Sequence, residues 1–162
     1  MDVKSLPFNK SDFISQQFVD YLIEQCPLGN SRIHGIAHWT RVLINGRKLS
    51  KETGANLKVV ELFSVLHDAR RENDDYDPAH GKRAAELAEL CCGKWFDLTE
   101  EEMKDLYDAC FYHADGLTQH NMTVMTCWDA DRLDLGRVYI KPNPRYLCTK
   151  VAKSWINKAS SG

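Results

Sequence analysis

The sequence predicts an all-α protein with six or seven helices packed around one core. Two observations support this fold class. Apolar residues recur three and four positions apart along most of the chain, which is the spacing of one helix face. Runs that alternate apolar and polar residues, typical of a half-buried strand, are nearly absent. With 162 residues, we expect a single domain over residues 1–162 with a substantial buried core.

The composition excludes several classes of partner. A formal charge of −2 leaves no basic excess to neutralise a phosphate backbone, so general nucleic-acid binding is not expected. No apolar run approaches the roughly 20 residues that a membrane helix needs. Residues 1–7 lack the apolar centre of a signal peptide, so we expect a cytoplasmic protein without a membrane partner. The six cysteines lie within apolar helical patterns, and we expect reduced core thiols.

Capping and breaking residues mark the ends of the first two helices. Ser11 is the expected N-cap of the first helix, which Pro27 and Gly29 end. The second helix is expected over residues 36–52, and Gly54 ends it because glycine readily adopts the left-handed conformation at that point.

The remaining helices follow from similar signals. Thr99 and Glu102 match a capping box, which predicts the start of the fifth helix. An acidic stretch closed by Pro78 predicts a loop between the third and fourth helices. The other expected helices cover residues 57–71, 78–92, 123–135 and 146–158.

The third helix contains the most informative stretch of the chain. Residues 59–66 are apolar on nearly every side, so this helix is expected in the middle of the protein. His67 and Asp68 follow directly. A histidine and a carboxylate in such a place destabilise the fold unless something satisfies them, and a metal ion would do so.

Asp131 has a similarly apolar setting. Its neighbours one turn away, Cys127, Trp128 and Leu135, form a core face, so an ionised carboxylate there needs a cation. Spacing alone leaves Asp129 as an alternative. Alternatively, Asp131 binds no metal and forms a buried ion pair with an arginine, for which Arg132 and Arg137 are available.

His38 lies in the first turn of the second helix and shares a face with Val42. His34 precedes it by four residues, which is the histidine spacing of a zinc-protease helix. That motif needs a glutamate after its first histidine, and Gly35 stands there, so a zinc protease is excluded. His34 remains a candidate to orient a ligand or to face the substrate.

His38, then His67 and Asp68, then Asp131 resemble the H…HD…D signature of the HD-domain metal-dependent phosphohydrolases. The resemblance covers roughly residues 33–136. It implies an HD-type helical domain in which these four residues hold a metal ion. In that family the last ligand is generally the second acid of an Asp-x-Asp pair, which favours Asp131 over Asp129.

Family members that bind two metals add two histidines, and His80 and His113 match them. The resemblance therefore implies one ion, with a second as an alternative. If only one ion binds, these two histidines are expected to contact the substrate phosphate. A mixed histidine and carboxylate set suits Mn, Fe, Co, Ni or Zn, and Mg less well.

The expected activity is hydrolysis of a small phosphoester or phosphoanhydride, with a nucleotide as the leading substrate class, by attack of metal-activated water. Developing phosphate charge needs cations, and Arg70 and Lys82 are preferred over Arg71 and Arg83. The residues expected to act in catalysis are Asp68, His80, His113, Arg70 and Lys82.

Two other functions fit the same sequence. One is a non-catalytic HD module that binds a metal or a nucleotide, and the other is an all-α interaction protein whose histidines form core hydrogen bonds. Metal analysis together with a phosphatase screen separates these from an enzyme. The sequence leaves the substrate identity, the bond cleaved and the oligomeric state open.

Overall fold

The structure is a computed structural model and describes residues 7–160, so the expectation for the N-terminal segment 1–7 lies almost wholly outside the described residues. Over this range the chain forms helices and no strand, which confirms the all-α prediction. The α-helices are α1 (Gln16–Gln25), α2 (Ile36–Thr53), α3 (Leu57–Leu66), α4 (His80–Cys91), α5 (Glu100–Tyr112), α6 (Met122–Arg132) and α7 (Lys150–Ser160). Three short 3-10 helices are η2 (Pro7–Lys10), η3 (Leu135–Val138) and η4 (Pro144–Tyr146).

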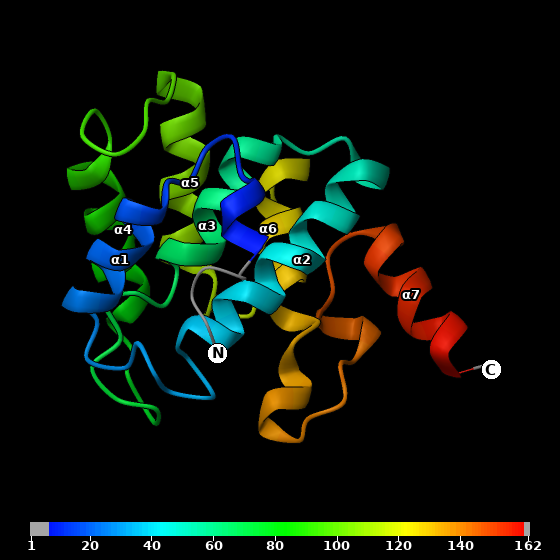
Figure 1. Cartoon of the computed structure of the whole chain (residues 1–162). Helices are drawn as coiled ribbons and strands as arrows, with labels where there is room; N and C mark the ends of the chain where they lie inside the picture. Colours follow the sequence, from blue (N-terminus) through cyan, green and yellow to red (C-terminus); the bar gives the residue numbers. More distant parts are fainter. Residues whose placement is uncertain (1–6, 161–162) are drawn as a thin grey trace.

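Helix α3 is at the centre of the bundle. It packs against α1, α2, α4, α5 and α6, which surround it in Figure 1. Asn56 caps its start by accepting hydrogen bonds from the amides of Lys58 and Val59. Every residue from 59 to 66 is buried, as the apolar run predicts. The central helix therefore delivers His67 and Asp68 into the interior.

Helix α3 is shorter than its predicted range of 57–71. It ends at Leu66, and the chain continues in turns in which the amide of Ala69 donates to the carbonyl of Leu66 and that of Arg71 to Asp68. These three-residue hydrogen bonds replace the helical pattern, so side chains after His67 no longer follow helical spacing.

Two glycines allow neighbouring helices to approach closely. A β-carbon on Gly46 of α2 would lie 2.5 Å from a methyl carbon of Val60 on α3. A β-carbon on Gly81 of α4 would lie 2.6 Å from the backbone oxygen of Phe111 on α5. Because both distances are shorter than a carbon contact allows, glycine is required at these two crossings.

Several predicted helix ends need correction. Ser15, not Ser11, caps α1, because Ser11 accepts from the amides of Phe13 and Ile14 in a turn before the helix. Helix α4 begins at His80 rather than at Pro78. Helix α6 ends at Arg132, three residues early, and α7 begins at Lys150, four residues late.

Other features agree with the sequence. The capping box of Thr99 and Glu102 is present, and Gly54 closes α2 with φ 75°. All six cysteines are free, but only four of them are buried, because Cys92 and Cys148 are half-buried and do not belong to the expected core set. Among the helices of residues 7–160, none combines the length and the apolar character that crossing a membrane requires.

Candidate metal centre

The first group of potential ligands joins three parts of the chain. His38 comes from the first turn of α2, His67 and Asp68 from the end of α3, and Asp131 from α6. The Nε2 atoms of His38 and His67 lie 3.1 Å apart. Asp131 Oδ1 lies 3.1 Å from the first of these nitrogens and 3.4 Å from the second, and Asp68 Oδ2 lies 3.4 Å from each.

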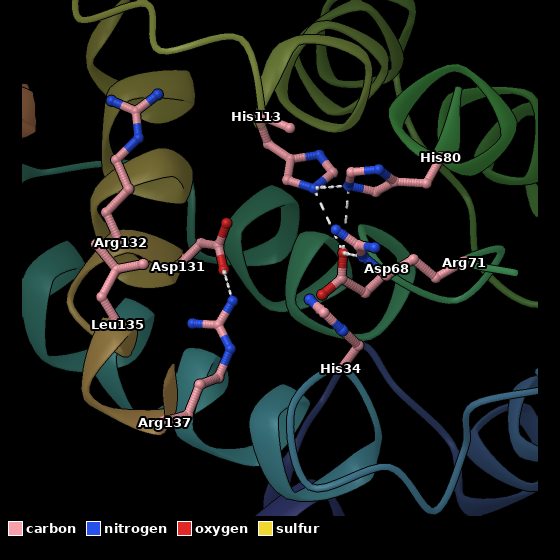
Figure 2. Close-up of a pocket in the computed structure, with 10 residues that line it drawn as sticks. His34, Asp68, Arg71, His80, His113, Asp131, Arg132, Leu135 and Arg137 are labelled. Atoms are coloured by element: carbon pink, nitrogen blue, oxygen red, sulfur yellow. Dashed lines mark hydrogen bonds and ion pairs between the residues drawn. The ribbon is translucent and has the colours of Figure 1, made fainter. Parts of the chain in front are cut away.

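The second group shares Asp68. Its other oxygen, Oδ1, lies 3.6 Å from His80 Nε2 and 3.4 Å from His113 Nε2. His80 begins α4 and His113 follows α5, and their Nε2 atoms are 2.9 Å apart. Figure 2 shows these three side chains converging, with Asp131 facing them across the pocket. Asp68 therefore presents one oxygen to each pair of histidines.

The hydrogen bonds of the rings determine which nitrogen carries the hydrogen. The Nδ1 atoms of His67, His80 and His113 lie 3.0, 2.5 and 2.6 Å from the backbone oxygens of Phe63, Asp77 and Cys110. A carbonyl can only accept, so each Nδ1 must donate. In the neutral rings, the Nε2 atoms are then unprotonated, and their lone pairs converge on one another.

The Nδ1 atom of His38 also carries the hydrogen, but it donates to a side chain and not to the backbone. Its Nδ1 donates to Asp134 Oδ2 at 2.7 Å, and Asp134 Oδ1 accepts from the guanidinium of Arg41 at 2.8 Å. Such a carboxylate commonly fixes the tautomer and orientation of a metal-binding histidine. Asp134 was not among the ligand candidates taken from the sequence. Its spacing of three residues from Asp131, on one helical face, was the available signal.

The electrostatics of the site favour positive charge between these groups. Burial opposes ionisation of Asp68, yet the surrounding histidines, His67 first, hold the pKa of its carboxyl well below its usual range. Asp131 is held ionised against burial in the same way, chiefly by His67, so its pKa is also lowered. Burial lowers the pKa of His67, but Asp68 and Asp131 outweigh it and the pKa is raised overall. Burial and the nearby His113 lower the pKa of His80 to about 4.

The chemistry of these groups fits divalent metal ions. Imidazole nitrogens and carboxylate oxygens are ligands of transition metals such as Zn, Fe, Mn, Co and Ni. Two sets of three donors could each hold an ion, one of His38, His67 and Asp68, the other of Asp68, His80 and His113. Asp131 Oδ1 is buried without a hydrogen-bond partner and lies beside the first set. A cation there would satisfy this oxygen.

The sequence left Asp129 as an alternative metal ligand to Asp131, and the contacts of the two acids differ. Both oxygens of Asp129 accept hydrogen bonds at the start of α7, from the amides of Cys148 and Thr149 and from the Thr149 hydroxyl. Arg137 Nη2 lies 3.8 Å from Asp131 Oδ1, an ion pair longer than a hydrogen bond, so Asp131 faces an arginine as well as the imidazoles. Asp131, and not Asp129, is thus the acid beside the imidazoles.

A pocket of about 190 Å³ opens over both groups. Three half-buried arginines line it, and two of them, Arg71 and Arg137, lie on opposite sides of the acids in Figure 2. The Nε atom of Arg71 is buried without a hydrogen-bond partner. The other lining residues are His34, Asp68, His80, His113, Ala114, Asp131, Arg132 and Leu135. A basic rim around acidic ligands suits a phosphate bound to metal.

The two cations preferred from the sequence lie elsewhere. Arg70 donates to the side chain of Gln25 at 3.2 Å, and it lines a different surface depression. The side chain of Lys82 is 63% exposed and lies 3.9 Å from Glu86, one turn along α4. Arg83, the other candidate of that helix, donates through Nη2 to both carboxylate oxygens of Asp77 at 2.6 Å. Of the four candidates, the structure brings Arg71 to the pocket.

Comparisons with known proteins agree with this architecture. No family model and no curated protein matches the sequence. A crystal structure of a predicted HD superfamily hydrolase from an uncultured Thermotogales bacterium matches the fold with a TM-score of 0.69 and 22% sequence identity. The match covers 90% of this chain and 84% of the other.

The chain has the HD-type fold. The expected fold class is therefore confirmed, and the residues that resemble the HD signature lie together inside it. In this HD-type bundle the histidines and acids come from α2, α3, α4, α5 and α6, so the cluster forms only when the whole core is folded.

Proposed function

We propose that this protein is a metal-dependent phosphohydrolase that cleaves a small phosphoester or phosphoanhydride, with nucleotides as the leading substrate class. The observation that supports it most strongly is the convergence of four imidazole Nε2 atoms whose rings all donate through Nδ1. In neutral rings these nitrogens, 2.9 and 3.1 Å apart, repel one another unless a proton or a metal ion lies between them.

In this proposal His38, His67, Asp68 and Asp131 hold one divalent ion, and Asp68, His80 and His113 hold a second. A bound ion of this kind supplies a Lewis acid for a phosphoryl oxygen and lowers the pKa of a bound water to about 7. Because Asp68 directs one oxygen to each group, its loss should disturb both.

The arginines of the pocket bind the phosphate in this proposal. Arg71 and Arg137 would neutralise charge that develops on the phosphoryl oxygens, a contribution that arginine makes through its fixed set of donors. Arg137 is oriented by hydrogen bonds to the backbone oxygens of Ile33 and Asp134, and Arg71 by those of Asn73 and Asp75.

His34 is placed to handle a proton. Its Nδ1 lies 2.8 Å from Asp74 Oδ1, so this nitrogen donates to the carboxylate and leaves Nε2 able to accept a proton in the pocket. Burial lowers the pKa of His34, which favours the neutral ring at neutral pH. We infer that His34 accepts or returns a proton during phosphoester cleavage.

A metal analysis combined with a phosphatase screen tests the proposal. Protein purified and then loaded with Mn, Co, Ni or Zn should contain bound metal and should hydrolyse at least one small phosphoester. Asp68→Asn should lose both properties, while Asp97→Asn, at an exposed acid, serves as the matched control. Loaded protein that hydrolyses no phosphoester would leave a binding module as the better explanation.

A further inference from the structure

A second pocket, of about 380 Å³, adjoins the metal centre. His113, Ala114, Arg132 and Leu135 line both pockets, so the two share a wall. Its volume lies at the small end of the range of about 300–1,000 Å³ for sites that bind small molecules. A substrate whose phosphate lies over the metal ligands would therefore direct its ester group into this space.

The far wall of the second pocket comes from the segment between α6 and α7, which forms the gold and orange extension in Figure 1. Tyr139 has a left-handed backbone with φ 61°, an unusual conformation for a residue other than glycine. This turn lets the amide of Ile140 donate to the carbonyl of Leu135. Ile140 and Leu135 are thereby held on one side of the pocket.

The lining is mainly apolar and carries no acidic side chain. Its apolar residues are Leu135, Ile140, Pro142, Tyr146 and Leu147. Ile140 and Tyr146 keep about half of their surface exposed, at 53% and 54%. Exposed apolar surface beside a polar site is typical of ligand binding.

Arg132 and Lys141 add positive charge to this pocket. Arg132 Nη1 donates to the backbone oxygen of Tyr146, while its Nη2 is buried and has no hydrogen-bond partner. The guanidinium carbon of Arg132 lies 5.5 Å from the centre of the Trp128 ring, so a cation–π contact stabilises its charge beside the pocket. An uncharged or anionic ligand fits this charge, and a cationic one does not.

We propose that the second pocket binds the ester group of the substrate, and that this group is apolar, about the size of one aromatic ring, and not positively charged. Leu135, Ile140 and Tyr146 contact the ring, and Arg132 and Lys141 keep the surrounding charge positive. This inference rests on the proposed phosphohydrolase function, because the ring reaches the second pocket only when the phosphate of the substrate is bound over the metal ligands.

Benzyl phosphate and ethyl phosphate provide a matched pair of substrates. Both are alkyl esters with leaving groups of similar basicity, so a difference in their rates reports how the ester group is bound. We expect a kcat/KM for benzyl phosphate at least about tenfold higher, since even a methylene in an apolar pocket changes selectivity by about 10–200-fold. Ile140→Asp should reduce the benzyl-to-ethyl ratio to near one. Leu90→Asp, at an exposed leucine that lines neither of these pockets, should leave this ratio as in the wild type.

Binding of benzylphosphonate and ethylphosphonate, which are not hydrolysed, separates this inference from the proposed activity. Tighter binding of benzylphosphonate that Ile140→Asp removes would support the pocket even in a protein without turnover. Hydrolysis of both esters with equal kcat/KM, or a preference that Ile140→Asp leaves intact, would overturn the pocket assignment while the phosphohydrolase function stood. If Ile140→Asp only unfolds part of the protein, the rates for both esters should fall together and their ratio should stay as in the wild type. An unchanged ratio would therefore count against a role for Ile140 in binding the ester group.

Discussion

The Nε2 atoms of His80 and His113 lie 2.9 Å apart, although each ring donates its Nδ1 hydrogen to a backbone carbonyl. Two nitrogen lone pairs at that distance need a proton or a metal ion between them. His38 and His67 repeat the relationship at 3.1 Å on the other side of Asp68. The hydrogen bonds at Nδ1, three to backbone carbonyls and one from His38 to Asp134, therefore favour a cation between the two nitrogens of each pair.

Asp68→Asn should remove metal from both groups of ligands. The amide keeps the size of the carboxylate but loses the charge that faces His67 and His113. We expect bound metal to fall to about a tenth or less and hydrolysis to be lost, because metal sites depend strongly on the charge of their ligands. Elemental analysis of dialysed protein measures this. Wild-type metal content in Asp68→Asn, or an equal loss in Asp97→Asn, would contradict the assignment.

Asp134→Ala should weaken metal binding without removing a ligand. It leaves His38 Nδ1 and the Arg41 guanidinium without their shared carboxylate. Loss of such an orienting residue typically costs about 10–100-fold in metal affinity. Competition with a chromophoric chelator measures the affinity. The matched control is Asp108→Ala, which removes the carboxylate that contacts His120 at the protein surface. This variant should keep the wild-type affinity for metal.

Arg71→Gln should lower kcat/KM for a phosphoester by about 100-fold, the scale seen when one donor to a developing oxyanion is removed. Arg70→Gln and Lys82→Gln should change it less than about twofold, because neither side chain lines the pocket. Steady-state kinetics on the three variants decide between them. A large loss of kcat/KM in Arg70→Gln with no loss in Arg71→Gln would contradict this assignment and would favour Arg70, as the sequence predicted.

The difference between Arg70 and Arg71 shows what a sequence pattern can and cannot predict here. The apolar run before His67 correctly predicted a buried helix, and the resemblance to the HD signature correctly predicted the HD-type fold. Helical spacing was then extended to residue 71, whereas the chain leaves the helix after Leu66. Once turns replace the helix, the direction of each side chain depends on local hydrogen bonds that no periodicity encodes.

The ligand candidates were easier to anticipate than their surroundings. A carboxylate on a core face, such as Asp131, is conspicuous in a sequence because burial without a cation is unfavourable. Asp134 and Arg137 act through contacts with residues about a hundred positions away, His38 and Ile33. The second pocket forms in an irregular segment around Tyr139, whose conformation follows no helix or strand pattern.

Titration of His80 should make metal-free protein less stable as the pH drops from about 6.5 to 4, while His67, whose pKa is raised, contributes in the opposite direction. Burial and His113 lower the pKa of the His80 ring to about 4, below the value of about 6.5 in an unfolded chain. Within that window the unfolded state binds a proton that the folded state does not, so stability rises with pH. Urea unfolding at several pH values measures the slope. His80→Gln should show a shallower slope than the wild type, and His120→Gln should not.

Gly81→Ala should destabilise the fold by about 1–3 kcal/mol, the usual cost of overpacking. Its β-carbon would meet backbone oxygens of Phe111 and Cys110 at 2.6 and 2.9 Å, and backbone cannot move aside cheaply. Gly136→Ala, where no atom lies within 4 Å of the added carbon, is the control. Denaturant unfolding compares the two. Equal stability of both variants would show that α4 and α5 do not need this close approach.

The most direct test of the metal centre is anomalous X-ray diffraction from crystals of the protein loaded with Mn or Zn. The proposed site predicts one anomalous peak among His38, His67, Asp68 and Asp131, and a second among Asp68, His80 and His113. Loaded crystals with no anomalous peak in contact with Asp68 would contradict the assignment and leave the converging histidines as hydrogen-bonding residues of the core.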